Sequence, residues 1–279
     1  MKILKNITIE GSKEKPILLD LFFTETKTVK PLVIFVHGFK GFKDWGHFDL
    51  VAKTFAQNGL AFLKFNFSYN GTTPEHPTEF ADLEAFGNNN YIIELNDLEK
   101  VIDWISNNNT FSDEIDPSKI FLIGHSRGGG ISILKASEDP RIKKIVTWAS
   151  VSNFLNRNKQ QTIDTWKEKG VVHTFNSRTK QNMPLYAQFY ETLLANRERL
   201  NIIKAVKDLK IPFLIIHGTN DEAVSEKDAK ELRISATHSQ LLIIDGATHT
   251  FGAKHPFEEV VLPPDANTVV LETIHFFKE

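Results

Sequence analysis

The stretch Ile120-Phe121-Leu122-Ile123-Gly124-His125-Ser126-Arg127-Gly128 decides the fold of this chain. Its four consecutive apolar residues predict a buried strand, and the two glycines around Ser126 predict a sharp turn into a helix. Side chains at Gly124 and Gly128 would collide with the neighbouring helix and strand. We therefore expect Ser126 at the tip of the turn, with a strained backbone, an exposed hydroxyl and a helix dipole pointing toward it.

The length and composition describe a globular chain with a large core. The 279 residues are 41% apolar and include 22 Phe, which suits one large α/β domain or two small ones. A formal net charge of −2 without a Lys/Arg-rich block argues against a nucleic-acid or anionic-membrane partner. The chain has no cysteine, which excludes disulfides, a thiolate nucleophile and Cys-ligated zinc. Because zinc-protease and nucleotide-binding motifs are also missing, we expect neither a metal nor a cofactor.

The amino terminus carries no secretory signal. Met1–Asn6 leads into alternating apolar and charged residues, without an apolar core segment or a small-residue cleavage site. No apolar stretch approaches the roughly 18 residues that would span a bilayer. We therefore expect a cytoplasmic protein with no membrane partner, and the sequence leaves open whether it is a monomer or a homodimer.

Short apolar runs alternate with helical patterns along the chain. Ile3–Ile9 and Ile17–Phe23 predict antiparallel strands joined through Gly11-Ser12. Six short, mostly apolar runs predict strands covered by helices on both faces: Leu32–Val36, Leu60–Phe65, Ile120–Ile123, Ile142–Trp148, Phe213–Ile216 and Leu241–Ile244. Helical spacing marks Phe48–Gln57, Tyr91–Ser106, Gly129–Ala136, Glu226–Arg233 and Asn267–Phe277. This alternation predicts a single domain over residues 1–279, built on a mostly parallel, eight-stranded, doubly wound α/β sheet.

The segment 151–203 interrupts this alternation. It contains no convincing strand, but helical patterns and aromatic residues are frequent in it. The segment is either a pair of extra helices packed on the core or a helical cap (lid) over the site, inserted after the sixth strand. Its position between two strands whose ends carry polar motifs favours the cap.

An acid and a histidine follow Ser126 at later strand ends. A serine hydroxyl becomes nucleophilic when a histidine removes its proton and a carboxylate orients that histidine. Asp221 comes shortly after the run Phe213–Ile216, and His249 comes shortly after Leu241–Ile244. The carboxyl ends of parallel strands meet at one sheet edge, where ligands bind. The order Ser126, Asp221, His249 is that of the α/β-hydrolases and differs from that of chymotrypsin and subtilisin.

The chain resembles the α/β-hydrolases along nearly its full length. The likeness is carried by Val36-His37-Gly38-Phe39, Gly124–Gly128, His217–Asp221 with Val224, and Gly246–His249. Within that superfamily it is most similar to bacterial carboxylesterases and cinnamoyl (feruloyl) esterases, and to dienelactone-hydrolase-like and prolyl-oligopeptidase-like domains. The resemblance implies the α/β-hydrolase fold and a serine carboxylesterase that cleaves small-molecule esters through an acyl-enzyme.

The resemblance also separates the candidates for each catalytic role. It favours Asp221, three residues before Val224, as the acid, and His249, after the last strand, as the base. His125 and His217 are interpreted as structural, each with a ring nitrogen bonded to backbone. The residues set aside by this choice are Glu222, Asp245, His238 and His255.

An oxyanion hole is the remaining requirement, because negative charge develops on the carbonyl oxygen during acyl transfer. The expected donors are the backbone N–H groups of Arg127, which follows the nucleophile, and of Phe39, which follows His37-Gly38. The loop 39–45 brings aromatic side chains and two lysines beside this hole. It either binds an aromatic or acidic part of a substrate, or it is a solvated loop in which Asp44 caps the next helix.

Two other functions use the same features. A serine peptidase or acyl-peptide hydrolase would keep the triad, but nothing in the chain resembles the propeller domain that oligopeptidases add. A non-catalytic binding protein of the α/β-hydrolase fold would usually lack a triad residue, and here none is missing.

Overall fold

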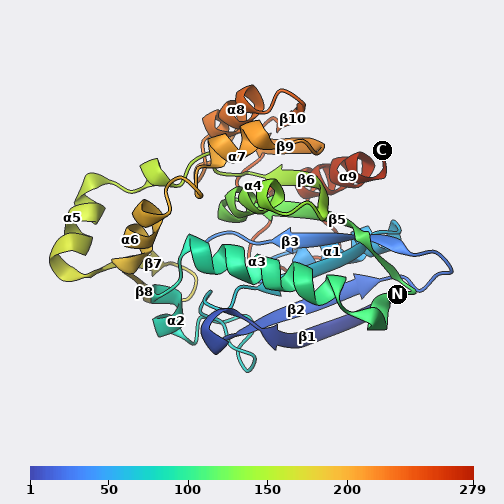
Figure 1. Cartoon of the computed structure of the whole chain (residues 1–279), viewed down its shortest axis with the longest axis horizontal. Coiled ribbons are helices and arrows are strands. Elements are labelled where there is room, and N and C mark those ends of the chain that lie inside the picture. Colours follow the sequence, from blue (N-terminus) through green and yellow to red (C-terminus); the bar gives the residue numbers. More distant parts are fainter.

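A twisted eight-stranded sheet forms the centre of the molecule (Figure 1), in a computed structural model that describes all residues from 1 to 279. The strand order is β1-β2-β4-β3-β5-β6-β9-β10. Only β2 is antiparallel to its neighbours, and the other pairs are parallel. The strands are β1 (Lys2–Glu10), β2 (Pro16–Phe23), β3 (Lys30–Val36), β4 (Ala61–Asn66), β5 (Ile115–His125), β6 (Ile142–Trp148), β9 (Phe213–Gly218) and β10 (Ser239–Ile244). The predicted mostly parallel, eight-stranded sheet is confirmed.

Helices cover both faces of the sheet. On one face lie α3 (Tyr91–Ser106), α4 (Arg127–Glu138), α7 (Ile202–Asp208) and α8 (Glu226–Ser235), which share a core of 41 buried residues with the strands. On the other face, α1 (Phe48–Gln57) and α9 (Pro264–Lys278) enclose a core of 25 buried residues. The short α2 (Leu83–Gly87) was not predicted, since five residues are too few to show a helical period. None of the helices combines the length and apolar character that a membrane crossing requires.

The continuous apolar runs are explained by this two-sided burial. In β3, Leu32, Ile34 and Val36 belong to the larger core, whereas Val33 and Phe35 belong to the core on the opposite face. Successive side chains of a strand point to opposite faces, so a strand between two helical layers needs apolar residues at every position.

The segment 151–203 differs from its prediction. It contains the helices α5 (Gln160–Lys169) and α6 (Gln188–Ala195), but between them lies a hairpin of β7 (Val171–Asn176) and β8 (Gln181–Tyr186). The expectation that it holds no strand is therefore wrong. The hairpin has too little apolar surface to be recognised alone, and tertiary packing stabilises it: Met183 is fully buried against Phe42, Phe80 and Phe86.

Candidate active site

Ser126 occupies the turn between β5 and α4 in a strained conformation. Its backbone has φ 57° and ψ −120°, a region that non-glycine residues rarely adopt. The flanking residues must be glycines because neighbouring backbone lies too close for a side chain. A Cβ on Gly124 would lie 2.4 Å from the Gly128 carbonyl oxygen, and a Cβ on Gly128 would lie 2.2 Å from that of Val36. The turn therefore accepts no side chain at either position, as the sequence predicted.

Asp221 and His249 lie in direct contact. The ring atom His249 Nδ1 is 2.8 Å from Asp221 Oδ2, and Asp221 Oδ1 accepts the backbone N–H groups of Ala223 and Val224, also at 2.8 Å. Burial would raise the pKa of Asp221, but hydrogen bonds from His217, His249 and Val224 hold it well below its usual range. The ionised carboxylate can only accept, so Nδ1 of His249 carries a proton and Nε2 is left free to act as a base.

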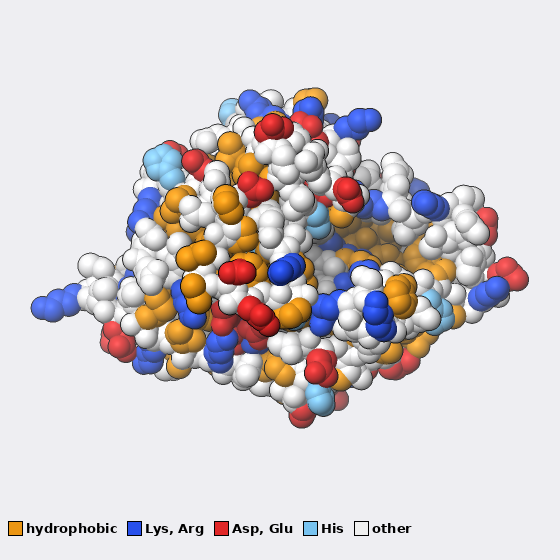
Figure 2. Space-filling model, turned by 180° about the vertical axis from the view of Figure 1, so that it is seen from behind, with side chains coloured by type: hydrophobic (Ala, Val, Ile, Leu, Met, Phe, Trp, Pro, Cys, Tyr) orange, Lys and Arg blue, Asp and Glu red, His pale blue; other side chains and the backbone are white.

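Ser126 and His249 line one pocket of about 420 Å³ at the carboxyl ends of the strands. Figure 2 shows a hollow in this face, with apolar side chains inside it and Lys and Arg side chains at its edge. No hydrogen bond joins the Ser126 hydroxyl to His249 in this structure, so the base shares the pocket with the serine without touching its hydroxyl. The remaining lining residues are His37, Gly38, Phe39, Lys40, Gly41, Trp45, Phe48, His125, Asn176, Arg178, Thr250, Ala253, Lys254 and His255.

The two predicted oxyanion residues flank Ser126. A Cβ on Gly38 would lie 2.9 Å from Ser126 Cβ and 3.4 Å from its Oγ, which places the Gly38-Phe39 backbone against the serine. The backbone N–H of Phe39 donates to no protein acceptor. Arg127 is the first residue of α4, so its N–H has no acceptor inside the helix. Both N–H groups are therefore available to a ligand.

The side chain of Arg127 packs away from the pocket. Its guanidinium lies over the rings of Phe39, Tyr91 and Phe189, at 4.2, 5.1 and 5.2 Å from their centroids. One of its nitrogens is 3.2 Å from a carboxylate oxygen of the buried Glu94. Burial raises the pKa of Glu94, and the charge of Arg127 opposes that rise. The side chain is thus a packing element that joins α4 to α3, α6 and the loop after β3.

Two further histidines line the pocket in a neutral form. Burial lowers the pKa of His125 to about 3, with a smaller contribution from His249, and His125 Nε2 lies 2.9 Å from the His249 carbonyl oxygen. Burial likewise lowers the pKa of His37 to about 4, and its Nδ1 lies 2.9 Å from the Gly38 carbonyl oxygen. Behind Asp221, Nε2 of the buried His217 lies 2.9 Å from the Val224 carbonyl oxygen and 3.3 Å from Asp221 Oδ2. Each of these rings holds backbone beside the catalytic candidates.

The carboxylate–histidine pair of the site is Asp221–His249, and none of the four alternative residues takes part in such a pair. Glu222 is exposed, and Asp245 accepts a hydrogen bond from Thr219 at 3.0 Å. His238 is exposed on the segment before β10. His255 does line the pocket, but its Nδ1 accepts the backbone N–H of Gly46 at 2.9 Å, which fixes it as a neighbour of the 39–47 loop.

Sequence reasoning missed Asn176, Arg178 and Lys254 as pocket residues. The first two lie on the β7–β8 hairpin, whose turn begins where the Asn176 side chain accepts the N–H groups of Arg178 and Thr179. A polar Asn-Ser-Arg-Thr stretch between two strands of β-forming residues is a turn signal, and it would have located this hairpin.

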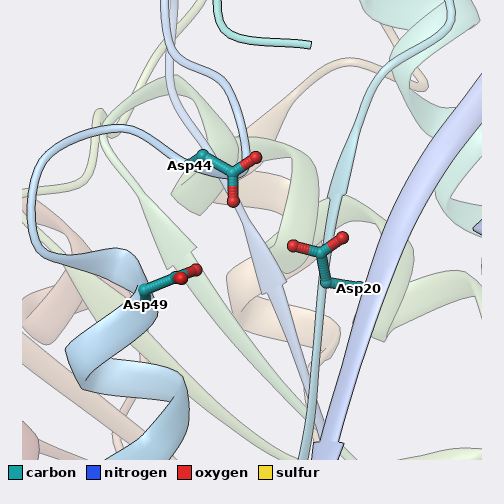
Figure 3. A group of neighbouring side chains, drawn as sticks. All are labelled: Asp20, Asp44 and Asp49. Atoms are coloured by element: carbon teal, nitrogen blue, oxygen red, sulfur yellow. The ribbon is translucent and has the colours of Figure 1, made fainter. Parts of the chain in front are cut away.

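A cluster of carboxylates lies beside the loop 39–45, from which Lys43 and Asp44 point inward. Asp20, Asp44 and Asp49 each bring one oxygen within 4.8 Å of the others (Figure 3). The Lys64 ammonium contacts all three carboxylates, and Lys43 lies 2.9 Å from Asp20 and 2.6 Å from Asp44. Lys5, 2.6 Å from Asp49, supplies a third ammonium for the three carboxylates. The cluster is therefore an ion-pair network with a buried centre, whose carboxylates already have cationic partners.

This network changes both hypotheses for the loop 39–45, as a substrate-binding loop and as a solvated loop in which Asp44 caps the next helix. Lys43 is fully buried, so it neither faces solvent nor reaches a substrate. Asp44 pairs with lysines, and the position before α1 belongs to His47, so Asp44 does not cap that helix. The other lysine, Lys40, lines the pocket.

Comparison with known proteins places the chain in a family. The sequence model of the BD-FAE family matches residues 19–235, most of the chain. The protein belongs to the BD-FAE family. One relative of this BD-FAE chain, a Mycoplasma pneumoniae protein provisionally named esterase/lipase 2, is 27% identical over 242 residues, which cover 78% of this chain and 81% of the relative.

Solved structures share the fold of this BD-FAE protein along its whole length. Est1E from Butyrivibrio proteoclasticus with bound ferulic acid superposes with a TM-score of 0.74 at 19% identity, covering 98% of both chains. The α/β-hydrolase GrgF from Penicillium sp. sh18 gives a TM-score of 0.72 at 15% identity, covering 100% of this chain and 98% of GrgF. The predicted α/β-hydrolase fold and the predicted resemblance to esterases are confirmed.

Proposed function

We propose that this BD-FAE protein is a serine hydrolase that cleaves carboxylic esters of small molecules. The observation that carries the proposal is the placement of His249, whose Nδ1 is bonded to the buried Asp221 while its ring shares a pocket with the strained Ser126. The esterase name of the Mycoplasma relative and the ferulic acid in Est1E support an ester as the bond cleaved.

The proposed reaction begins with proton transfer from Ser126 Oγ to Nε2 of His249 as Oγ attacks the ester carbonyl carbon. Asp221 stabilises the imidazolium that forms. The N–H groups of Phe39 and Arg127 stabilise the oxyanion, and each such donor typically contributes about 3–4 kcal/mol to lowering the barrier. His249 then returns the proton to the leaving alcohol, which yields an acyl-enzyme. Water, activated by His249, releases the acid and restores Ser126.

Within a single domain of residues 1–279, we assign the segment 151–203 the role of a cap over this site. Asn176 and Arg178 of its hairpin form part of the pocket wall. The hairpin also contacts the loop after β3, because Lys40 Nζ lies 3.4 Å from the Phe175 carbonyl oxygen. A cap in this place shields the reacting ester from bulk water.

The test compares kcat/KM for 4-nitrophenyl acetate in purified wild type, Ser126→Ala and Asp221→Asn. We expect Ser126→Ala to lose about a thousandfold or more. We expect Asp221→Asn to lose activity because an amide favours the wrong tautomer of His249 and carries no charge to stabilise its imidazolium. Ser118→Ala, at an exposed serine on the far end of β5, is the matched control. Wild-type turnover by Ser126→Ala would contradict the proposal, and faster cleavage of aminoacyl 4-nitroanilides than of esters would favour a peptidase.

A further inference from the structure

The charges around the pocket are unbalanced. Three of its lining residues are Lys or Arg (Lys40, Arg178 and Lys254), and none is Asp or Glu. None of the three forms an ion pair with an acidic side chain. Elsewhere in the molecule the buried lysines do have such partners: Lys43 lies 2.9 Å from Asp20, and Lys30 lies 2.9 Å from Glu114. Arg178 and Lys254 are exposed and Lys40 is half-buried, so these three cations without an acidic partner come together at the mouth of one cavity.

Arg178 is held in place without an acidic partner. Its guanidinium lies 5.4 Å from the ring centroid of Phe42 and 5.8 Å from that of Phe80, and both rings are buried. The turn that carries it is fixed by the Asn176 side chain. Burial lowers the pKa of Arg178, and the charge of Glu79 offsets this only in part. The guanidinium is therefore partly desolvated, with donors left over for an anion.

Lys40 likewise lines the pocket without an acidic partner. The backbone of Lys40 has a positive φ of 57°. Its ammonium lies 5.6 Å from the Phe39 ring centroid and 3.4 Å from the Phe175 carbonyl oxygen. Burial lowers the pKa of Lys40, with no acidic group to oppose the shift. A bound anion would supply the missing partner.

Three histidines of the pocket, His37, His125 and His255, add no positive charge at neutral pH. Burial lowers the pKa of His37 to about 4 and that of His125 to about 3. Burial and the charge of Arg178 also lower the pKa of His255, against a smaller opposing effect of Asp44. The positive potential of the cavity therefore comes from Lys40, Arg178 and Lys254.

We propose that the pocket selects esters that carry a carboxylate in addition to the ester group, and that Arg178 is the main residue that binds this carboxylate, assisted by Lys40 and Lys254. This inference builds on the proposed ester hydrolysis and adds the substrate class. The guanidinium fork suits a planar carboxylate, and the pocket's aromatic residues Phe39, Trp45 and Phe48 suit an aromatic or flat acyl or alcohol part.

The test uses a pair of aryl acetates that differ in charge, 4-acetoxybenzoate and 4-acetylphenyl acetate. The ratio of their kcat/KM values is measured in wild type, Arg178→Gln and Arg178→Lys, so that differences in intrinsic reactivity cancel between proteins. We expect Arg178→Gln to lower the ratio of anionic to neutral ester by about tenfold, and Arg178→Lys to restore part of it. Lys180→Gln, an exposed cation on the same hairpin turn and outside the pocket lining, is the matched control for net charge.

A binding measurement separates this inference from the proposed reaction. Calorimetry compares 4-acetamidobenzoate with 4-acetamidobenzamide, whose amide bonds replace the ester. We expect the carboxylate to bind wild type more tightly, and we expect Arg178→Gln to remove the difference. A ratio unchanged in Arg178→Gln, or equal binding of the two amides, would overturn the inference even if neutral esters are hydrolysed. Selective binding of the carboxylate without any ester turnover would support the inference and contradict the proposed function.

Discussion

The guanidinium of Arg127 lies 4.2 Å from the ring centroid of Phe39, so the two residues proposed to form the oxyanion hole also pack against each other through their side chains. Their backbones belong to different strand ends, one after β5 and the other after β3. This stacking holds the two turns together, and it thereby fixes the position of one backbone N–H group relative to the other. The ion pair of Arg127 with Glu94 anchors the stack to α3.

We expect Arg127→Ala to lower both activity and stability without abolishing the reaction, because the backbone N–H remains. Activity on 4-nitrophenyl acetate should fall about tenfold, and the free energy of unfolding by about 2–4 kcal/mol, since Glu94 is left buried without its partner. Urea denaturation and steady-state kinetics measure the two effects. In the double variant with Glu94→Gln, stability should partly recover while activity stays low; full recovery of both would show that the stacking on Phe39 is irrelevant.

Gly38→Ala should abolish most of the esterase activity with a modest loss of stability. Its Cβ would lie 2.9 Å from Ser126 Cβ and 3.1 Å from the His125 carbonyl oxygen, so the serine or the oxyanion loop must shift. A displacement of a few tenths of an ångström to 1 Å at such a site typically costs about a hundredfold in rate. Gly59→Ala is the control, because a Cβ there meets nothing within 4 Å although φ is +78°. Equal activities of the two variants would contradict the proposed position of the loop.

Lys43→Met should destabilise the protein by about 3–5 kcal/mol, because it leaves the carboxylate of Asp20 partly uncompensated inside the core. Both side chains are fully buried and 2.9 Å apart. Lys2→Met, which removes an exposed pair with Glu25 at 3.5 Å, should change stability by less than about 1 kcal/mol. Chemical denaturation of both variants gives the comparison, and equal effects would show that the buried network contributes no more than a surface pair.

Acidification should destabilise the protein below about pH 6.5. Burial lowers the pKa of His37 and His47 to about 4 and that of His125 to about 3, from an ordinary value of 6.5. Between these values the unfolded chain binds protons that the folded chain does not, so stability falls as the pH falls. Each such histidine contributes a slope of up to about 1.4 kcal/mol per pH unit. The lowered pKa of Asp221 acts in the same direction at still lower pH.

Unfolding free energies at pH 7, 6 and 5 check this slope. His47→Gln should reduce the slope of unfolding free energy against pH by up to about 1.4 kcal/mol per pH unit, the contribution of one proton. His238→Gln, at an exposed position, should leave this slope unchanged. A slope that is the same in wild type and His47→Gln would mean that this histidine titrates normally in the folded state.

The sequence predicted those parts of the fold that follow from local rules. The runs around Leu32–Val36 and Ile120–Ile123 had to be buried strands, because a continuous apolar run needs cover on both faces. The turn at Ser126 followed from its glycines, whose Cβ atoms would meet backbone oxygens. The Asp221–His249 contact was expected from the shared edge of the sheet together with the resemblance to the α/β-hydrolases, which selected these two residues among the candidates.

The parts that were missed depend on contacts between distant segments. The β7–β8 hairpin is stabilised by the burial of Met183 against aromatic residues from other elements, and nothing local reveals those partners. Lysines usually lie at the surface, yet Lys43 and Lys64 are buried because they form ion pairs with Asp20 and Asp44. Arg178 became a pocket residue only because the hairpin folds over the sheet edge.

The most direct test of the account is intact-protein mass spectrometry after treatment with a fluorophosphonate, which traps an activated serine as a stable phosphonyl ester. The account predicts one adduct per chain, located on Ser126 by peptide mapping, much slower labelling in His249→Ala, and none in Ser126→Ala. Labelling of wild type that persists unchanged in Ser126→Ala, or an unlabelled wild type that still hydrolyses esters, would contradict the assignment of Ser126 as the nucleophile.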